Sequence, residues 1–95
     1  MNADDLKADK EAFVETFIAE LLAMLQGAYL VAIENGMTLE TIAEGMDATP
    51  AEIEDLIFGR IELDLRSLAE LCCVMGFNIE FDIIPTEELN RPLIR

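Results

Sequence analysis

The sequence predicts one mostly α-helical domain with a long N-terminal helix, three shorter helices and one C-terminal β-strand. Three observations predict it. Residues 4–35 lack proline and repeat apolar side chains at steps of three and four. Between residues 38 and 76, short apolar segments follow Thr or Asp and end near glycine, as capped helices do. Residues 77–84 alternate apolar and polar side chains, the period of a half-buried strand.

The predicted helix at residues 4–35 is apolar on nearly all sides, so it must be covered on more than one face. A domain of 95 residues has too little chain to provide that cover alone. We expect one face to pack on the chain's own core and another on a second subunit. The side chains assigned to this dimer interface are Phe13, Phe17, Ile18 and Leu22.

Two threonines mark the starts of the next two helices. Thr38 is the expected N-cap of a helix at residues 39–45. Thr49 precedes Pro50 at the first helical position and Glu52 three residues on, a strong start signal for a helix that ends near Gly59. A further helix is expected at residues 64–75, closed by Gly76.

The predicted strand at residues 77–84 has no partner in an otherwise helical chain. Unpaired backbone donors and acceptors beside an apolar face are costly, so the strand requires a neighbour. The same strand of a second subunit is the simplest one, related by two-fold symmetry. The apolar side chains assigned to this pairing are Phe77, Ile79, Phe81 and Ile83. We expect one domain over residues 1–85, with residues 86–95 as a mobile tail.

The composition argues against several classes of function. Twenty acidic and six basic residues give a formal net charge of −14. Binding to nucleic acid or to an anionic membrane surface requires clustered Lys and Arg. The sequence has no His, the commonest general base and metal ligand. We therefore expect no enzymatic activity and no bound metal or cofactor.

Location is predicted from the cysteines and the apolar segments. Cys72 and Cys73 are adjacent, and neighbouring helical residues point about 100° apart, so a disulfide between them is not expected. They are interpreted as small buried hydrophobes in a reducing compartment, with a vicinal redox switch as the alternative. The acidic start of the chain does not resemble a signal peptide. The apolar stretch at 21–33 is too short to span a bilayer. We expect a cytoplasmic protein without a membrane partner.

The segment at residues 37–53 reads MTLETIAEGMDATPAEI and resembles the helix-turn-helix of the Cro/cI repressor (Xre) family. Thr38 stands where the family caps its second helix, Ile42 and Ala43 where it has a Leu-Ala pair, and Ile53 at the core Ile of the recognition helix. The match continues without a gap to Gly76, over about forty residues. It implies a lambda-repressor-like bundle. The predicted strand is similar to the C-terminal strand that antitoxin-type members pair across a dimer.

Members of this family bind operator DNA as two-fold dimers, with the recognition helix in the major groove. The resemblance assigns that contact to Thr49, Pro50, Ala51, Glu52 and Asp55, with Arg60 and Arg66 as possible phosphate contacts. Residues 37–76 hold nine acidic side chains and these two arginines, a net charge of −7. Two arginines cannot supply the roughly six to ten phosphate contacts of a tight operator complex.

Three functions remain open. The first is a homodimeric transcriptional co-regulator that binds a basic protein. That partner is either a DNA-binding regulator or a component of the transcription machinery, and the co-regulator contacts nucleic acid only weakly or through it. The second is a sequence-specific autorepressor or antitoxin of the Xre type. The third is a DNA mimic that inhibits another protein. The best candidate for the partner-binding surface is the cluster of Glu52, Asp55 and Glu62.

Overall fold

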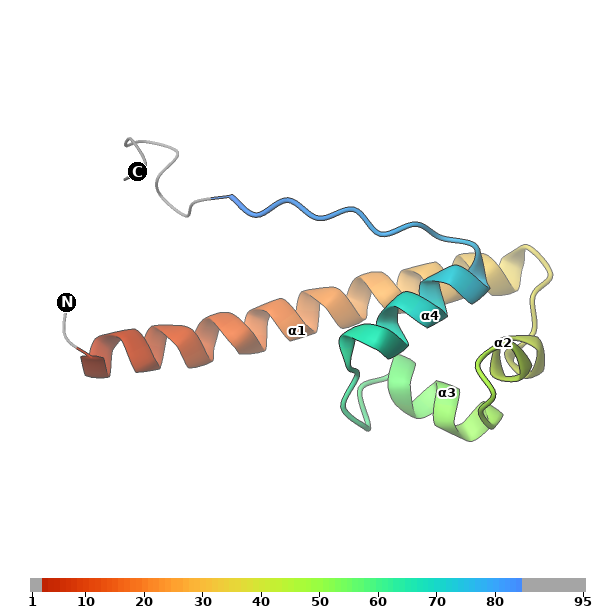
Figure 1. The fold of residues 1–95 in the computed structure, drawn as a ribbon, viewed down its shortest axis with the longest axis horizontal. Helices are drawn as coiled ribbons and strands as arrows, with labels where there is room; N and C mark the ends of the chain where they lie inside the picture. The colour runs from red at the N-terminus through yellow and green to blue at the C-terminus, as the bar shows by residue number, and fades with distance from the viewer. Residues whose placement is uncertain (1–2, 85–95) are drawn as a thin grey trace.

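The computed structural model describes residues 3–84 and contains four α-helices there (Figure 1). Their bounds are Ala3–Glu34 for α1, Leu39–Gly45 for α2, Pro50–Ile57 for α3 and Leu65–Met75 for α4. The prediction of a mostly helical chain is confirmed, and the four predicted helices agree with these bounds to within one residue. The predicted tail at residues 86–95 lies outside the described residues.

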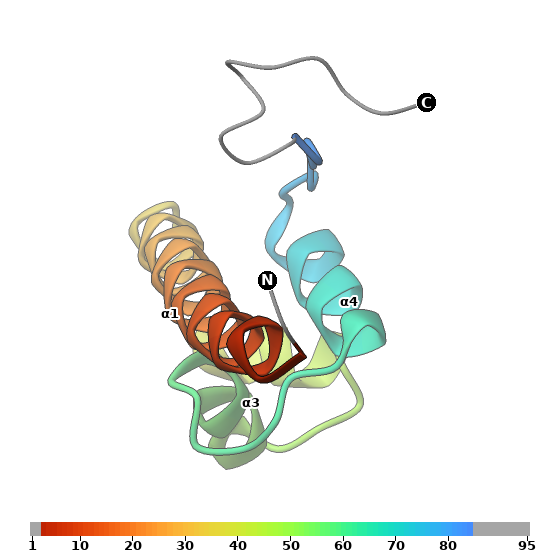
Figure 2. The same cartoon turned by 90° about the vertical axis from the view of Figure 1, so that its left-hand side faces the viewer.

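α1 consists of an exposed N-terminal half and a C-terminal half that packs on the other helices. Every residue from 3 to 20 is exposed, and only Leu25 and Ala32 of α1 are buried. Figure 2 looks nearly along α1 and shows α3 and α4 on two sides of a shared interior. The start of α1 projects beyond both helices (Figure 1). Within residues 3–84, the chain therefore covers one face of the second half of α1 and leaves the side chains of the first half exposed.

The starts of the three short helices are fixed by side-chain caps. Thr38 Oγ1 accepts a hydrogen bond from the Thr41 backbone N–H at 3.1 Å. Thr49 forms a reciprocal capping box at the start of α3, and Asp64 Oδ1 accepts from the Ser67 N–H at 2.7 Å at the start of α4. The predicted caps at Thr38 and Thr49 are confirmed, because capping depends on residues only three positions apart.

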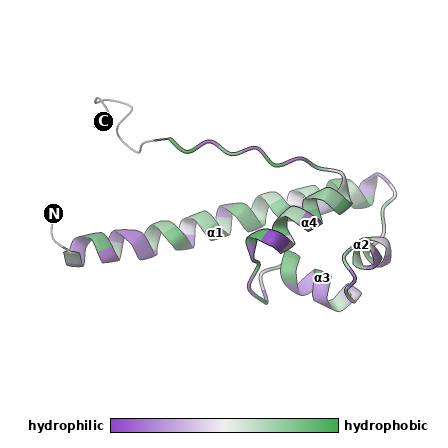
Figure 3. Ribbon diagram, viewed as in Figure 1, coloured by the Kyte–Doolittle hydropathy of each residue, from purple (hydrophilic) through white to green (hydrophobic). Residues whose placement is uncertain are grey.

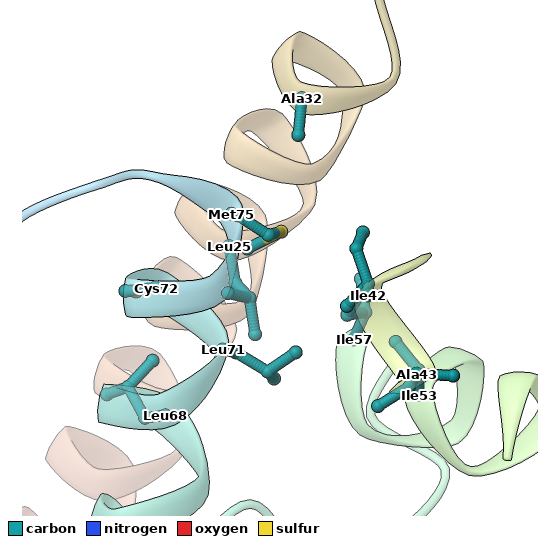
Figure 4. Close-up of a cluster of buried hydrophobic side chains, with 10 residues drawn as sticks. All are labelled: Leu25, Ala32, Ile42, Ala43, Ile53, Ile57, Leu68, Leu71, Cys72 and Met75. Atoms are coloured by element: carbon teal, nitrogen blue, oxygen red, sulfur yellow. The ribbon is translucent and has the colours of Figure 1, made fainter. Parts of the chain in front are cut away.

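The core is entirely apolar and is assembled from all four helices. Ile42, Ile53, Ile57 and Leu71 are fully buried at its centre, where α2 and α3 face α4 (Figure 4). No polar or charged side chain is buried among residues 3–84. The remaining buried members are Leu25, Ala32, Ala43, Leu68, Cys72 and Met75.

Residues 77–84 do not form the predicted β-strand in the single chain. After α4 ends at Gly76 with φ +87°, the segment is extended and runs back in the direction of the N-terminus of α1 (Figure 1). Ile79 is half-buried, and the other seven residues of the segment are exposed. A strand is defined by backbone hydrogen bonds to a neighbour, and this part of the chain offers none. The alternation of apolar and polar side chains predicted the extended backbone, but it could not show which neighbouring strand would pair with it.

α1 is long and apolar enough, by length and composition, to cross a membrane. An 18-residue window of the helix has a mean hydropathy of 1.7, and 11% of that window is buried (Figure 3). The prediction from the sequence rests on the apolar stretch at 21–33, which Gln26 and Gly27 interrupt, whereas the helix continues well beyond that stretch. Signal sequences near an N-terminus and the mostly buried core helices of soluble proteins meet the same criterion, so one such helix is weak evidence for a membrane span.

Candidate interaction surfaces

The predicted recognition residues lie together on α3 and its N-cap. Thr49 is the N-cap, Pro50, Ala51 and Glu52 are exposed in the first turn, and Asp55 is half-buried in the next. Ile53 and Ile57 fix the orientation of the helix because both are fully buried in the core. α3 therefore presents this surface to solvent on a short, well-anchored helix.

Glu52 stabilises its own helix. Its Oε1 accepts a hydrogen bond from the Thr49 backbone N–H at 2.8 Å, and the Glu52 N–H donates to Thr49 Oγ1 at 3.1 Å. Two backbone donors at the start of α3 are satisfied in this way. One carboxylate oxygen is thus engaged locally, and the side chain still adds negative charge to the surface.

Arg60 and Arg66, the predicted phosphate contacts, each bind a carboxylate of their own chain. Arg60 Nε donates to Asp55 Oδ1 at 2.7 Å, and its guanidinium lies 5.8 Å from the centre of the Phe58 ring. Arg66 Nε donates to Glu70 Oε2 at 3.3 Å along α4. Both arginine side chains are exposed, so each pair stabilises the fold only weakly. The pairs nevertheless neutralise both basic residues of residues 37–76.

Positive charge is scarce over the rest of the described chain. The other two cations within residues 3–84 are Lys7 and Lys10, on the exposed half of α1, and neither forms an ion pair there. The same residues contain no group of three or more side chains able to hold a metal ion. The surface around α3 is consequently acidic, with no basic stripe to follow a nucleic-acid backbone.

The structure separates the four predicted interface residues of α1 into two pairs. Phe13 and Phe17 are 62% and 49% exposed, with no core against them. Ile18, 48% exposed, and the half-buried Leu22 instead line a cavity of about 350 Å³ with residues 59–64. Leu22 lies so close to Gly59 that a Cβ there would meet Leu22 Cδ1 at 2.8 Å. Leu22 is thus packed against its own chain.

Three further apolar residues of α1 extend the exposed face of Phe13 and Phe17. Leu6, Met24 and Val31 are 57%, 70% and 43% exposed. Leu6 precedes Phe13 by seven residues, and Phe17, Met24 and Val31 follow one another at the same spacing. This seven-residue repeat could have identified the face from the sequence, but the many other apolar residues of the helix obscure it.

A groove of about 360 Å³ runs between α1, α4 and the start of the extended segment. Leu21, Met24 and Val31 line it from α1, and Phe77 and Ile79 line it from the segment. Phe81 and Ile83, the other two residues of the predicted strand interface, are 63% and 100% exposed further along. The groove therefore adjoins both apolar surfaces that the single chain leaves open.

The two cysteines are free and lie in different surroundings. Cys72 is buried in the core, whereas Cys73 is exposed. Burial raises the pKa of the Cys72 thiol, which disfavours the reactive thiolate. The interpretation as a small buried hydrophobe thus applies to Cys72, and Cys73 is a surface thiol.

Comparisons with known proteins add no relative: no family model, no curated protein and no solved structure matches this chain. The resemblance to the Cro/cI repressor family therefore rests on the residues quoted from the sequence. The functional argument rests on the surfaces described above.

Proposed function

We propose that the protein is a homodimeric transcriptional co-regulator of Cro/cI-repressor-like fold, which acts by binding a basic protein partner and does not hold DNA itself. The observation that carries the proposal is the pairing of Arg60 with Asp55 and of Arg66 with Glu70. These pairs leave the helix-turn-helix region without a free cation for phosphate.

The arrangement of α2 and α3 supports the repressor-like part of the proposal. The two short helices are joined by residues 46–49, and the turn passes through Asp47 in the left-handed conformation at φ +55°. Ile42 and Ala43 of α2 are buried with Ile53 of α3. This is the packing expected of the residues that carry the family resemblance.

The charge of the α3 surface supports a basic partner. Asp55 lies half-buried in the second turn of α3, and Glu62 is exposed in the loop that follows the helix, in a region of net charge −7. An acidic surface accelerates encounter with a positively charged protein and disfavours the approach of phosphate. Glu62 forms no ion pair within residues 3–84, so its carboxylate is available to an arginine or lysine of the partner.

Two open apolar surfaces support the homodimer. One is the exposed face of α1. The other is the extended segment after Phe77, whose own N–H donates to the Cys72 carbonyl; residues 78–84 form no backbone hydrogen bond within residues 3–84 and can pair with the same segment of a second copy. We place the protein in the cytoplasm, since two free cysteines suit a reducing compartment. Glu15 and Glu20 within the apolar part of α1 would be costly inside a bilayer.

The experiment is capture of partners from host lysate by tagged protein, with nuclease treatment and a wash at moderate salt. The matched variants are Ala51→Lys/Glu62→Lys on the α3 surface and Glu11→Lys/Ala12→Lys on exposed α1, which change the net charge equally. We expect a stoichiometric basic protein that survives nuclease, is kept by the α1 variant and is lost by the α3 variant. Recovery of nuclease-sensitive material alone would instead support direct DNA binding.

A further inference from the structure

We propose that α1 pairs antiparallel with α1 of a second copy, in the register that places Lys10 opposite Glu20 of the other chain. The inference rests on the homodimer of the proposed function and specifies how that dimer is built. It is independent of the protein partner at α3.

The exposed face of α1 has the seven-residue repeat of a two-helix seam. One position of the repeat is occupied by Phe17, Met24 and Val31, preceded by Ala3 and Lys10. The other position, three residues after the first, holds Leu6, Phe13, Glu20 and Gly27. These are the two core positions of a coiled coil, conventionally a and d. The stripe runs along the helix from residue 3 to residue 31 and is apolar except at Lys10 and Glu20.

Residues 3–84 of the single chain do not cover this stripe. Its five large apolar side chains are between 43% and 70% exposed, and every residue from 3 to 20 is exposed. Helices in proteins are stabilised mainly by tertiary packing of an apolar face, and residues 3–20 have no buried side chain within the described chain. The projecting half of α1 therefore requires a partner for its stability.

The two charged residues of the stripe select the direction of pairing. In a parallel pair each core residue faces its own counterpart, which would set Lys10 against Lys10 and Glu20 against Glu20. In an antiparallel pair an a position faces a d position of the other helix. Lys10 then faces Glu20 twice, once on each side of the two-fold axis, so both charges are compensated.

The same register places every apolar residue of the seam opposite an apolar one. Phe13 of one copy faces Phe17 of the other, Leu6 faces Met24, and Ala3 faces Gly27. A shift by seven residues in either direction would set Lys10 and Glu20 against uncharged residues. The chosen register overlaps residues 3–27 of the two helices, about 37 Å at 1.5 Å per residue, and covers the whole exposed half of α1.

The groove beside α1 lies where this register brings the second copy. Residues 3–15 of the second helix run along residues 15–27 of the first, and Leu21, Met24 and Gly27 of that stretch line the groove. Lys7 of the second copy falls beside Leu21, at a groove whose lining includes Glu80. Gly27 has no atom within 4 Å of the position that a Cβ would take, so the surface is open to close approach by another helix.

The test is a charge exchange at Lys10 and Glu20, read as the dimer dissociation constant by sedimentation. We expect K10E and E20K each to weaken the dimer by about tenfold, because each sets like charges opposite one another at both ends of the seam. The double variant K10E/E20K should return to within about threefold of the wild type. Both positions are exposed in the single chain, so its fold is not at risk.

E15K is the matched control for E20K. The two changes alter the net charge equally, but Glu15 lies on the side of α1 opposite the seam. Relief of general self-repulsion in so acidic a protein would make both variants tighter dimers. The register instead predicts that E20K weakens the dimer while E15K does not. An E20K dimer as tight as that of E15K would overturn the register.

A cross-link gives a second readout. Thr16 lies beside the proposed two-fold axis, so Thr16→Cys in a Cys73→Ser background should form an intermolecular disulfide under mild oxidation. Glu15→Cys in the same background should not. If the wild type is a dimer and none of these substitutions changes its dissociation constant or its cross-linking, the register is refuted and the homodimer is retained. A wild-type monomer, or a protein that sediments with phosphatidylcholine vesicles, would refute both the register and the dimer.

Discussion

Arg60 Nε lies 2.7 Å from Asp55 Oδ1, so the basic residue nearest the predicted recognition helix is held by an acidic residue of that same helix. Asp55→Asn should release Arg60 and increase the affinity for a short DNA duplex at low salt. The slope of log binding constant against log salt concentration should steepen by about one, because one more phosphate is neutralised. Fluorescence anisotropy measures this. Glu54→Gln removes the same charge without touching the ion pair and serves as the control. Equal gains in the two variants would show that net charge, and not the pair, limits contact with DNA.

Thr49→Ala should destabilise the domain by about 1 kcal/mol, a fall in Tm of roughly 4–8 °C, since it removes the side-chain acceptor of the capping box. Glu52→Gln keeps an acceptor for the Thr49 N–H and should change the Tm far less. Thermal unfolding followed by circular dichroism measures both. A Thr49→Ala Tm equal to that of the wild type would mean that α3 is held by its buried isoleucines alone.

Gly59→Ala should cost more stability than Gly36→Ala. Both glycines have positive φ, +76° and +99°, so an alanine is strained by about 1–2 kcal/mol at either position. At Gly59 the new Cβ also meets Leu22 Cδ1 at 2.8 Å, whereas at Gly36 it meets nothing within 4 Å. Chemical denaturation gives the difference. Equal losses would indicate that α1 and the loop at residues 59–64 separate easily.

Acid should remove the contribution of the Asp64 cap. The hydrogen bond from the Ser67 backbone N–H lowers the pKa of Asp64 below its ordinary value of 3.8. The unfolded chain then binds a proton at higher pH than the folded one, so this stability is present above the unfolded pKa and is lost as the pH falls through the folded pKa. The Tm difference between wild type and Asp64→Asn should therefore shrink between about pH 5 and pH 2. A constant difference would show that the charge of Asp64 plays no part.

Phe81→Lys should weaken the dimer if residues 77–84 of two copies pair as antiparallel strands. Phe81 is 63% exposed in the single chain, so the change leaves the helical body intact. Asp82→Lys, whose side chain points to the opposite face of an extended backbone, is the control. Sedimentation equilibrium should show about a tenfold larger dissociation constant for Phe81→Lys alone. Identical constants would restrict the interface to α1.

Elements with short-range causes could be predicted from the sequence. The caps at Thr38 and Thr49, the closing Gly76 and the core position of Ile53 depend on residues within one or two helical turns. The strand could not be predicted in the same way, because alternation describes one backbone and pairing requires another. The acidity of the α3 surface followed directly from the residue types.

Which faces meet was decided by the tertiary structure. α1 is apolar on most sides, so its sequence did not distinguish Leu22, packed near Gly59, from Phe17, which is left open. The partners of Arg60 and Arg66 likewise depend on how the chain turns after α3 and enters α4. Periodicity and capping act along the chain and fix the helices, whereas a side chain's neighbour depends on how those helices pack.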